Sequence, residues 1–229
     1  MLSVLNVAYP FAAVGPNAVG GAEQVLTAID AALVAHGHRS LVIACEGSST
    51  SGTLLPLPAG LSPDEQARTH ALLRRRIEDV WDDVDLIHLH GIDFPAYLPR
   101  AGKPVLVTLH LPPDWYPQEI FAPARADTWL NCVSEDQHQR CPPSSALLKP
   151  IRNGVPVRQL AVASHAKRGF ALMLGRICPE KGQHLGLEAA HQAGVSALLG
   201  GVAFGYPAHI DYFESRIKPL LDRHRRHVG

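Results

Sequence analysis

The sequence predicts an α/β protein in which a doubly wound parallel sheet is followed by an incomplete second Rossmann-like unit. Two observations lead to this fold class. Short apolar segments typical of buried strands alternate with segments of helical periodicity, which is the pattern of a parallel sheet. The alternation starts again near residue 169, but only two strands and two helices are expected before residue 229. The second unit is therefore expected to have a small core.

Six apolar segments of the first unit are expected to be strands, namely residues 2–9, 39–45, 52–57, 85–89, 105–109 and 128–133. Residues 22–36 have helical spacing and are followed by Gly37, a C-terminal cap. Residues 62–82 are expected to form a second helix, because Ser62 is followed by proline and then by glutamate at the capping-box position. Ser134 begins a third helix by the same pattern.

The chain is divided by its patterning into a first domain over residues 1–155, a linker over 156–168 and the start of a second domain over 169–229. Within the second domain, residues 211–221 are amphipathic and predict a helix. The basic segment 223–227 is interpreted as a solvated helix end. In a parallel sheet the loops at 10–21, 90–95, 110–120 and 134–136 all follow strands, so they are expected at one sheet edge, where ligands bind.

Composition limits the classes of partner. The 229 residues hold 21 Lys and Arg, 21 Asp and Glu and 13 His, so the formal net charge is zero, and 46% of the residues are hydrophobic. Zero net charge gives no case for binding nucleic acid. There is no secretory signal pattern and no transmembrane segment, and the four cysteines lack zinc-site spacing. A cytoplasmic protein is expected, with peripheral contact with a membrane left open.

The most informative motif is the turn Gly175-Arg176-Ile177-Cys178-Pro179-Glu180-Lys181-Gly182. It follows an apolar strand-like segment and precedes a helical one. A strand-to-helix turn offers backbone N–H groups and a helix dipole to an anion. Arg176 and Lys181 would add fixed positive charge suited to a diphosphate. The alternative is that both are ordinary surface charges, and the anion site is the favoured interpretation.

A second glycine-rich loop, with Gly20 and Gly21, follows the first expected strand. Glycine permits close approach of the backbone to a phosphate, but a purely structural turn explains the loop equally well. It is not a Walker P-loop, because Gly21-Ala22 stands where Lys-Ser/Thr is required.

Three histidines lie on or after expected strands. His88 and His90 alternate and so share one face, and His110 follows the strand at 105–109. Two histidines can hold a metal, but no third ligand has evident spacing, so contact with a ligand or a satisfied core histidine is favoured. His110 is a candidate for substrate contact, with a surface histidine as the alternative. No nucleophile elbow is present.

These pieces, taken in order, resemble the family 4 glycosyltransferases, which are retaining enzymes of the GT-B fold. The resemblance includes Gly20-Gly21-Ala22-Glu23, residues 85–91, Thr108-Leu109-His110, Asn153-Gly154-Val155 and the turn at 175–182. It implies two Rossmann-like domains that face each other across a cleft. A nucleotide-diphosphate sugar would bind mainly to the second domain and the acceptor mainly to the first.

The resemblance also implies roles for single residues. Arg176 and Lys181 match the diphosphate-binding cations, Gly20 and Gly21 match a loop that approaches the donor phosphates, and His110 matches a catalytic histidine near the reaction centre. Glu23, His90, Ser134 and Asn153 are candidate cleft contacts.

The implied chemistry is hexosyl transfer with retention, without a metal and without a cofactor besides the UDP- or GDP-linked donor. The acceptor would be a glycan, a lipid or a small molecule. The developing charge on the leaving diphosphate would be stabilised by preorganised cations and helix N-termini.

The sequence departs from the family in one respect. The acidic E-x7-E motif of the donor domain is not found in its expected context; Glu214 and Asp222 have the spacing but are expected on one amphipathic helix, as a chance pair. Two alternatives therefore remain. The chain is a non-catalytic truncated or split form that needs a partner chain to complete the donor domain, or it is another nucleotide-sugar enzyme such as an epimerase.

Overall fold

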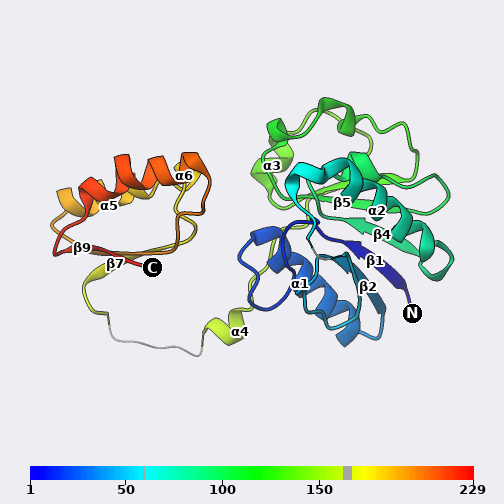
Figure 1. Ribbon diagram of the computed structural model, residues 1–229, viewed down its shortest axis with the longest axis horizontal. Coiled ribbons are helices and arrows are strands. Elements are labelled where there is room, and N and C mark those ends of the chain that lie inside the picture. The colour runs from blue at the N-terminus through cyan, green and yellow to red at the C-terminus, as the bar shows by residue number, and fades with distance from the viewer. Residues whose placement is uncertain (59, 162–166) are drawn as a thin grey trace. The chain divides into compact units, whose positions relative to one another are not determined.

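A computed structural model describes residues 1–58, 60–161 and 167–229, and it divides into two compact units, Met1–Val155 and Pro156–Gly229 (Figure 1). Each unit has its own sheet and its own buried core, and each is described by itself below.

The first unit contains a six-stranded sheet in the order β3-β2-β1-β4-β5-β6. Its strands are β1 (Ser3–Val7), β2 (Arg39–Ala44), β3 (Thr53–Pro56), β4 (Leu86–Leu89), β5 (Val105–Leu109) and β6 (Thr128–Cys132). All five neighbouring pairs are parallel. This order is that of the doubly wound dinucleotide-binding fold, so the fold class expected for the first unit is confirmed.

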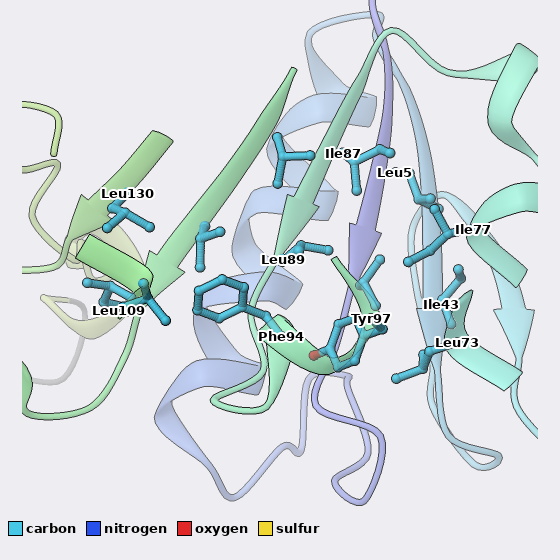
Figure 2. Close-up of a cluster of buried hydrophobic side chains, with 14 of the residues drawn as sticks. Leu5, Ile43, Leu73, Ile77, Ile87, Leu89, Phe94, Tyr97, Leu109 and Leu130 are labelled. Atoms are coloured by element: carbon cyan, nitrogen blue, oxygen red, sulfur yellow. The ribbon is translucent and has the colours of Figure 1, made fainter. Parts of the chain in front are cut away.

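Helices cover both faces of this sheet. Leu26 of α1 (Gly21–Ala35) packs with Val42 and Ala44 of β2, whereas Leu73 and Ile77 of α2 (Gln66–Asp79) belong to the larger core on the other face. Residues that alternate along a strand point to opposite faces. Figure 2 shows the larger core, in which side chains from α2 and from the sheet converge with the aromatic rings of the segment after β4.

The helix expected over 62–82 is three pieces: η1 (Pro63–Glu65), α2 and η2 (Trp81–Asp83). Ser62 stands at the N-cap position of η1, but its side chain makes no capping hydrogen bond, so that part of the prediction is wrong. By contrast, Ser134 caps α3 (Glu135–Arg140) as expected, because its Oγ accepts a hydrogen bond from the Gln137 N–H at 3.1 Å.

Short 3-10 helices occupy the long loops that follow the strands. They are η3 (Phe94–Tyr97), η4 (Pro113–Trp115) and η5 (Gln118–Phe121), and none was expected from the sequence. Aromatic residues of these segments, including Phe94, Tyr97 and Phe121, are buried in the larger core. The loops are therefore anchored by apolar burial, which fixes the backbone near the carboxyl ends of the strands.

The second unit contains a three-stranded parallel sheet in the order β7-β8-β9. Its elements are α4 (Val157–Leu160), β7 (Phe170–Leu174), η6 (Pro179–Lys181), α5 (Gln183–Gln192), β8 (Ser196–Gly200), α6 (Pro207–Tyr212), the π-helical η7 (Phe213–Ile217), η8 (Lys218–Leu220) and β9 (Arg225–Val228). The helix α4 falls in the segment 156–168, which the sequence predicts to be a linker and of which residues 162–166 lie outside the described part.

Two expectations for this unit are wrong. The basic segment 223–227 is not a helix end, because β9 pairs with β8 as a third strand. Asp222 helps to fix the turn before β9, since its Oδ1 accepts hydrogen bonds from the N–H groups of His224 and Arg225. Glu214 lies within η7 and Asp222 lies beyond the end of η8, so these two acidic residues do not share one helix.

Among the described residues, the core of the second unit lies on one face of its sheet. Ala197, Leu199, Leu187 and Tyr212 pack together there. On the opposite face Leu172 is 51% exposed and Leu174 is 75% exposed. In a doubly wound sheet both faces are covered, so the described part of this unit is incomplete, as the sequence predicts. No helix in the described part of the chain has the length and apolar character needed to cross a bilayer.

Candidate functional site

The first candidate site lies at the carboxyl edge of the first sheet, where the strand order reverses between β1 and β4. Ligands of doubly wound sheets bind at such a switch point. The loop with Gly20 follows β1, His90 follows β4, and His110 follows β5. The His90 N–H donates a hydrogen bond to the Val7 carbonyl at the end of β1, at 3.0 Å. The structure thus brings these sequence candidates to one edge of one sheet.

The three histidines singled out in the sequence form one cluster. The ring centroids of His88 and His90 lie 4.0 Å apart, and those of His90 and His110 lie 5.3 Å apart. His90 Nδ1 is hydrogen-bonded to His110 Nε2 at 3.0 Å, and His88 Nε2 is hydrogen-bonded to Thr108 Oγ1 at 2.8 Å. His90 Nε2 is buried and has no hydrogen-bond partner among the described residues.

Burial keeps the cluster uncharged. It lowers the pKa of His88 to about 3 and the pKa of His110 to about 4, and it places the pKa of His90 well below the usual value. The charge of His110 lowers the pKa of His88 further, since one imidazolium disfavours another. At neutral pH the cluster is therefore a set of hydrogen-bonding imidazoles rather than a source of positive charge.

Sequence reasoning missed a row of polar residues on the same face as His88. Asn6, Thr108 and Asn131 are all buried, and they occupy β1, β5 and β6. The Asn131 Oδ1 accepts a hydrogen bond from the Ile151 N–H at 2.8 Å. The available signal was polar residues alternating with apolar ones in strands that are otherwise hydrophobic.

Tyr116 and Gln137 hold the backbone around His110, and neither was a sequence candidate. The Tyr116 hydroxyl accepts hydrogen bonds from the N–H groups of His110 and Leu111, and burial raises its pKa to about 12. The Gln137 Nε2 donates to the carbonyls of Leu109 and Leu111 at 2.8 and 2.7 Å. Two carbonyls and two N–H groups beside His110 are therefore fixed by side chains.

The remaining candidates of the first unit have different surroundings. Gly20 is the N-cap of α1, and a Cβ at this position would overlap the buried Glu23 carboxylate, whereas the space around Gly21 is open. The Ser134 hydroxyl is engaged as the cap of α3. Asn153 is exposed, and its N–H donates to the Val133 carbonyl at 3.2 Å. Only the glycine loop and Glu23 lie at the start of a long helix.

The second candidate site is the turn from β7 to α5 in the second unit. The strand, turn and helix occur as the sequence predicts, with η6 inside the turn. Arg176 and Lys181 are both exposed, and neither takes part in an ion pair with any of the described residues. The Arg176 guanidinium carbon lies 5.9 Å from the centre of the Phe204 ring. The turn therefore presents two solvent-facing cations at the N-terminus of a ten-residue helix.

Glycines and a glutamine give this turn its shape. Gly182 has a φ of 62° and precedes α5, a left-handed conformation that favours glycine. A Cβ at Gly201 would overlap the carbonyl oxygen of Gly175, so the loops after β7 and β8 pass very close to each other. The Gln183 Nε2 donates to the Arg176 carbonyl at 2.8 Å. In α5, Leu187 and Ala190 are buried, whereas Leu185 is 60% exposed.

Comparison with known proteins identifies the family. The sequence profile described as Glycosyltransferase Family 4 matches residues 19–157, which is more than half of the chain. A search of curated proteins gives no match.

Several solved structures share the fold. AviGT4, a glycosyltransferase involved in avilamycin A biosynthesis, is 24% identical with a TM-score of 0.63, and the match covers 100% of this chain and 63% of AviGT4. An α-glucosyltransferase in complex with UDP and a 13-mer DNA is 14% identical with a TM-score of 0.58, covering 95% of this chain and 60% of that one. The lipopolysaccharide outer core galactosyltransferase WaaB is 10% identical with a TM-score of 0.55, covering 100% of this chain and 68% of that one.

The chain thus spans about three fifths of the length of the first two structures. Its α/β architecture agrees with the GT-B-like fold expected from the sequence. The profile match includes the Gly20 loop, the histidine cluster and the capped helix α3. The chain belongs to glycosyltransferase family 4.

Proposed function

We propose that this chain takes part in the transfer of a hexosyl group from a nucleotide-diphosphate sugar to an acceptor, with retention of anomeric configuration. The observation that carries the proposal is the turn from β7 to α5, with Arg176 and Lys181 exposed at a helix N-terminus. Membership of the family supplies the reaction class. One fold neighbour is described in complex with UDP, which supports a UDP-linked donor over a GDP-linked one.

The chemistry follows from where charge develops. When the bond between the anomeric carbon and the diphosphate oxygen breaks, negative charge grows on the departing nucleoside diphosphate. Arg176, Lys181 and the N–H groups at the start of α5 would stabilise this charge without reorganising. Fixed cations can therefore replace a divalent metal that would bridge the phosphates, and no cofactor besides the donor is proposed.

His110 is proposed to act at the reaction centre, and His90 to position it. The low pKa of His110, about 4 because of burial, keeps the ring neutral at physiological pH. A neutral imidazole can accept or donate a hydrogen bond to a sugar hydroxyl without competing with the cations for the diphosphate. Gly20, Gly21 and Glu23 are proposed to approach the donor from the first unit, and Ser134 and Asn153 remain candidate cleft contacts.

Calorimetry with UDP and GDP on the full chain tests the donor site. Arg176→Ala and Lys181→Ala should each weaken nucleotide binding, and each should lower donor turnover by about two orders of magnitude. Arg216→Ala is the matched control, because Arg216 is an exposed arginine of η7 in the same unit. Unchanged UDP affinity in both turn variants would remove the basis of the proposal.

A second candidate function is a non-catalytic chain that a partner chain completes. Two observations favour this candidate. Leu172 and Leu174 are exposed on the uncovered face of the sheet, and β7 pairs only with β8 among the described strands. Such a surface promotes association. Sedimentation velocity and calorimetry test this candidate. It replaces the first if the chain self-associates, if Leu174→Lys reduces the association and if no nucleotide binds. A monomer that binds UDP excludes it.

The proposed acceptors are glycans, lipids or small molecules. The zero net charge of the chain argues against nucleic acid as an acceptor.

A further inference from the structure

Three side chains of the second unit bring typical metal-ligand atoms together. Cys178 and Glu180 belong to the turn before α5, and His209 belongs to α6. The Cys178 sulfur, a Glu180 carboxylate oxygen and an imidazole nitrogen of His209 all lie within 4.8 Å of one another. No other group of three such side chains occurs within the part of the chain that the structure describes. We call these three residues the Cys178 cluster.

A backbone hydrogen bond and two aromatic side chains surround the Cys178 cluster. The Ile177 N–H donates to the Val202 carbonyl at 3.0 Å, which fixes the turn against the loop after β8. The centroid of the His209 ring lies 6.5 Å from that of Phe204 and 5.1 Å from that of Tyr206.

An unpartnered nitrogen is a second, independent observation. His209 Nδ1 is buried and makes no hydrogen bond with any described residue. A buried polar atom without a partner costs free energy, so native structures rarely contain one without a reason such as an ion or a ligand. The same imidazole brings one of its nitrogens within 4.8 Å of a thiol sulfur and a carboxylate oxygen, and this set of atoms suits a cation as the missing partner.

A catalytic Cys-His-Glu arrangement is the competing interpretation, and the electrostatics oppose it. Burial is the largest cause that raises the pKa of the Cys178 thiol, and Glu180 raises it further. A cysteine nucleophile needs a lowered pKa so that the thiolate is present at neutral pH. A metal ion removes this difficulty, because it binds the thiolate and displaces the proton.

We propose that Cys178, Glu180 and His209 form a Zn²⁺ site, with the sulfur, a carboxylate oxygen and Nδ1 as its three ligands and a fourth position open to water. Thiolate and imidazole ligands select zinc over magnesium or calcium. Bonds to a tetrahedral zinc of about 2.0–2.3 Å place its ligand atoms about 3.3–3.8 Å apart. The three atoms lie within 4.8 Å of one another, so they need to approach by no more than about 1.5 Å.

The proton and charge balance is explicit. Zinc binding breaks the S–H bond of Cys178, forms the Zn–S bond and releases one proton to solvent, while Glu180 and His209 bind without losing a proton. The charge of the cluster then changes from −1, for the carboxylate and the thiol, to zero. The turn thereby becomes more favourable for an anion beside Arg176. This ion is held by side chains of the protein, so it differs from a metal that would bridge the donor phosphates.

Zinc titration of the full chain against a chromophoric chelator tests the site. Cys178→Ser, Glu180→Gln and His209→Gln should each weaken this site by about 100-fold or more, since loss of even an outer partner of a metal ligand costs about 10–100-fold. Cys45→Ser, Glu188→Gln and His36→Gln are matched controls outside the cluster and should bind zinc as the wild type does. Cobalt in place of zinc should show a thiolate charge-transfer band that Cys178→Ser abolishes.

Proton release separates this site from surface histidines, because neutral histidines bind zinc without releasing a proton. The wild type should release about one proton per zinc near neutral pH, and Cys178→Ser should release none. His209 lies on α6 and is not a core residue. The variant His209→Gln therefore still tests the site if Cys178→Ser fails to fold. Equal zinc affinity in the wild type and all three variants would overturn the proposal. Nucleotide binding plays no part in this experiment, so its result stands apart from the donor-site test.

Discussion

His90 Nδ1 lies 3.0 Å from His110 Nε2, so the two rings share one hydrogen bond whose proton belongs to one of them. Geometry favours one assignment. If His110 donated, His90 would carry its proton on Nε2, which is buried and has no partner among the described residues. Buried N–H groups without an acceptor are rarer than buried acceptors without a donor. We infer that His90 donates from Nδ1 and that His110 carries its proton on Nδ1.

The first prediction concerns this tautomer. In His90→Phe an aromatic ring is retained but the donor is lost, so His110 should no longer hold a single tautomer. Nitrogen NMR of the imidazoles should show the wild-type His110 protonated at Nδ1 and the variant as a mixture. Sugar transfer should fall by up to about 100-fold through kcat, because a misplaced reacting group loses its orientation. His36→Phe, at the exposed end of α1, is the control, and an unchanged tautomer in His90→Phe would disprove the assignment.

The second prediction concerns pH and stability. Burial lowers the folded-state pKa of His110 to about 4 and that of His88 to about 3, whereas a histidine in the unfolded chain titrates near 6.5. Between the folded-state and unfolded-state pKa values, the unfolded chain binds more protons than the folded protein. Lowering the pH in this range therefore favours the unfolded state. The stabilising effect of neutral burial is complete above about pH 6.5, and it is lost as the pH falls towards about 4.

Denaturant unfolding followed by tryptophan fluorescence measures this effect, because Trp81, Trp115 and Trp129 all lie in the first unit. His110→Asn should flatten the dependence of the unfolding free energy on pH by up to about 1.4 kcal/mol per pH unit across this range. His36→Asn should leave the slope unchanged. A slope in His110→Asn equal to that of the wild type would show that this histidine is not held neutral by the fold.

Much of the fold could be predicted because short apolar segments bounded by polar residues are typical of the buried strands of a parallel sheet. The segment 105–109 coincides with β5, and the strand-turn-helix around Arg176 occurs where it was expected. The strand β9 could not be predicted in this way. Its residues Arg225 to Val228 are mainly basic, and they are a strand only because they pair with β8. Tertiary pairing outweighs local propensity there.

The candidate site was predictable to the extent that it depends on topology. A parallel sheet brings the ends of its strands to one edge, so the proximity of the Gly20 loop, His90 and His110 follows from the alternation of strands and helices. Contacts between side chains distant in sequence did not follow. The hydrogen bond between Thr108 and His88 and the proximity of His209 to Cys178 are two examples. Both depend on how the helices and strands pack, whereas the sequence predicts only the order of these elements.

The third prediction concerns the close approach of two loops in the second unit. A Cβ at Gly201 would overlap the Gly175 carbonyl oxygen, and Gly201 has a φ of 142°. Gly201→Ala should therefore destabilise the unit by roughly 1–3 kcal/mol, because backbone atoms cannot turn aside as a side chain can. Hydrogen exchange of the β8 amides measures the change. Gly205→Ala has open space around its Cβ and should exchange as the wild type does; equal protection in both variants would contradict the prediction.

The fourth prediction concerns Gln137, whose side chain joins the ends of β5 and β6. Its Nε2 donates to the carbonyls of Leu109 and Leu111, and its Oε1 accepts from the Val133 N–H at 2.8 Å. Gln137→Ala leaves three backbone groups unpaired and should cost about 2–4 kcal/mol of stability, measured by tryptophan fluorescence in urea. Gln139→Ala, on the exposed side of the same helix, should change it by less than about 0.5 kcal/mol.

Gln137→Glu distinguishes the two halves of this interaction. The carboxylate keeps an acceptor for the Val133 N–H, but it faces the carbonyls of Leu109 and Leu111 without a proton to donate. Repulsion should make this variant less stable than Gln137→Ala at neutral pH. Protonation restores one donor, so the difference between Gln137→Glu and Gln137→Ala should shrink as the pH falls. A difference that stays constant with pH would show that the two carbonyls beside His110 find other partners when the amide is absent.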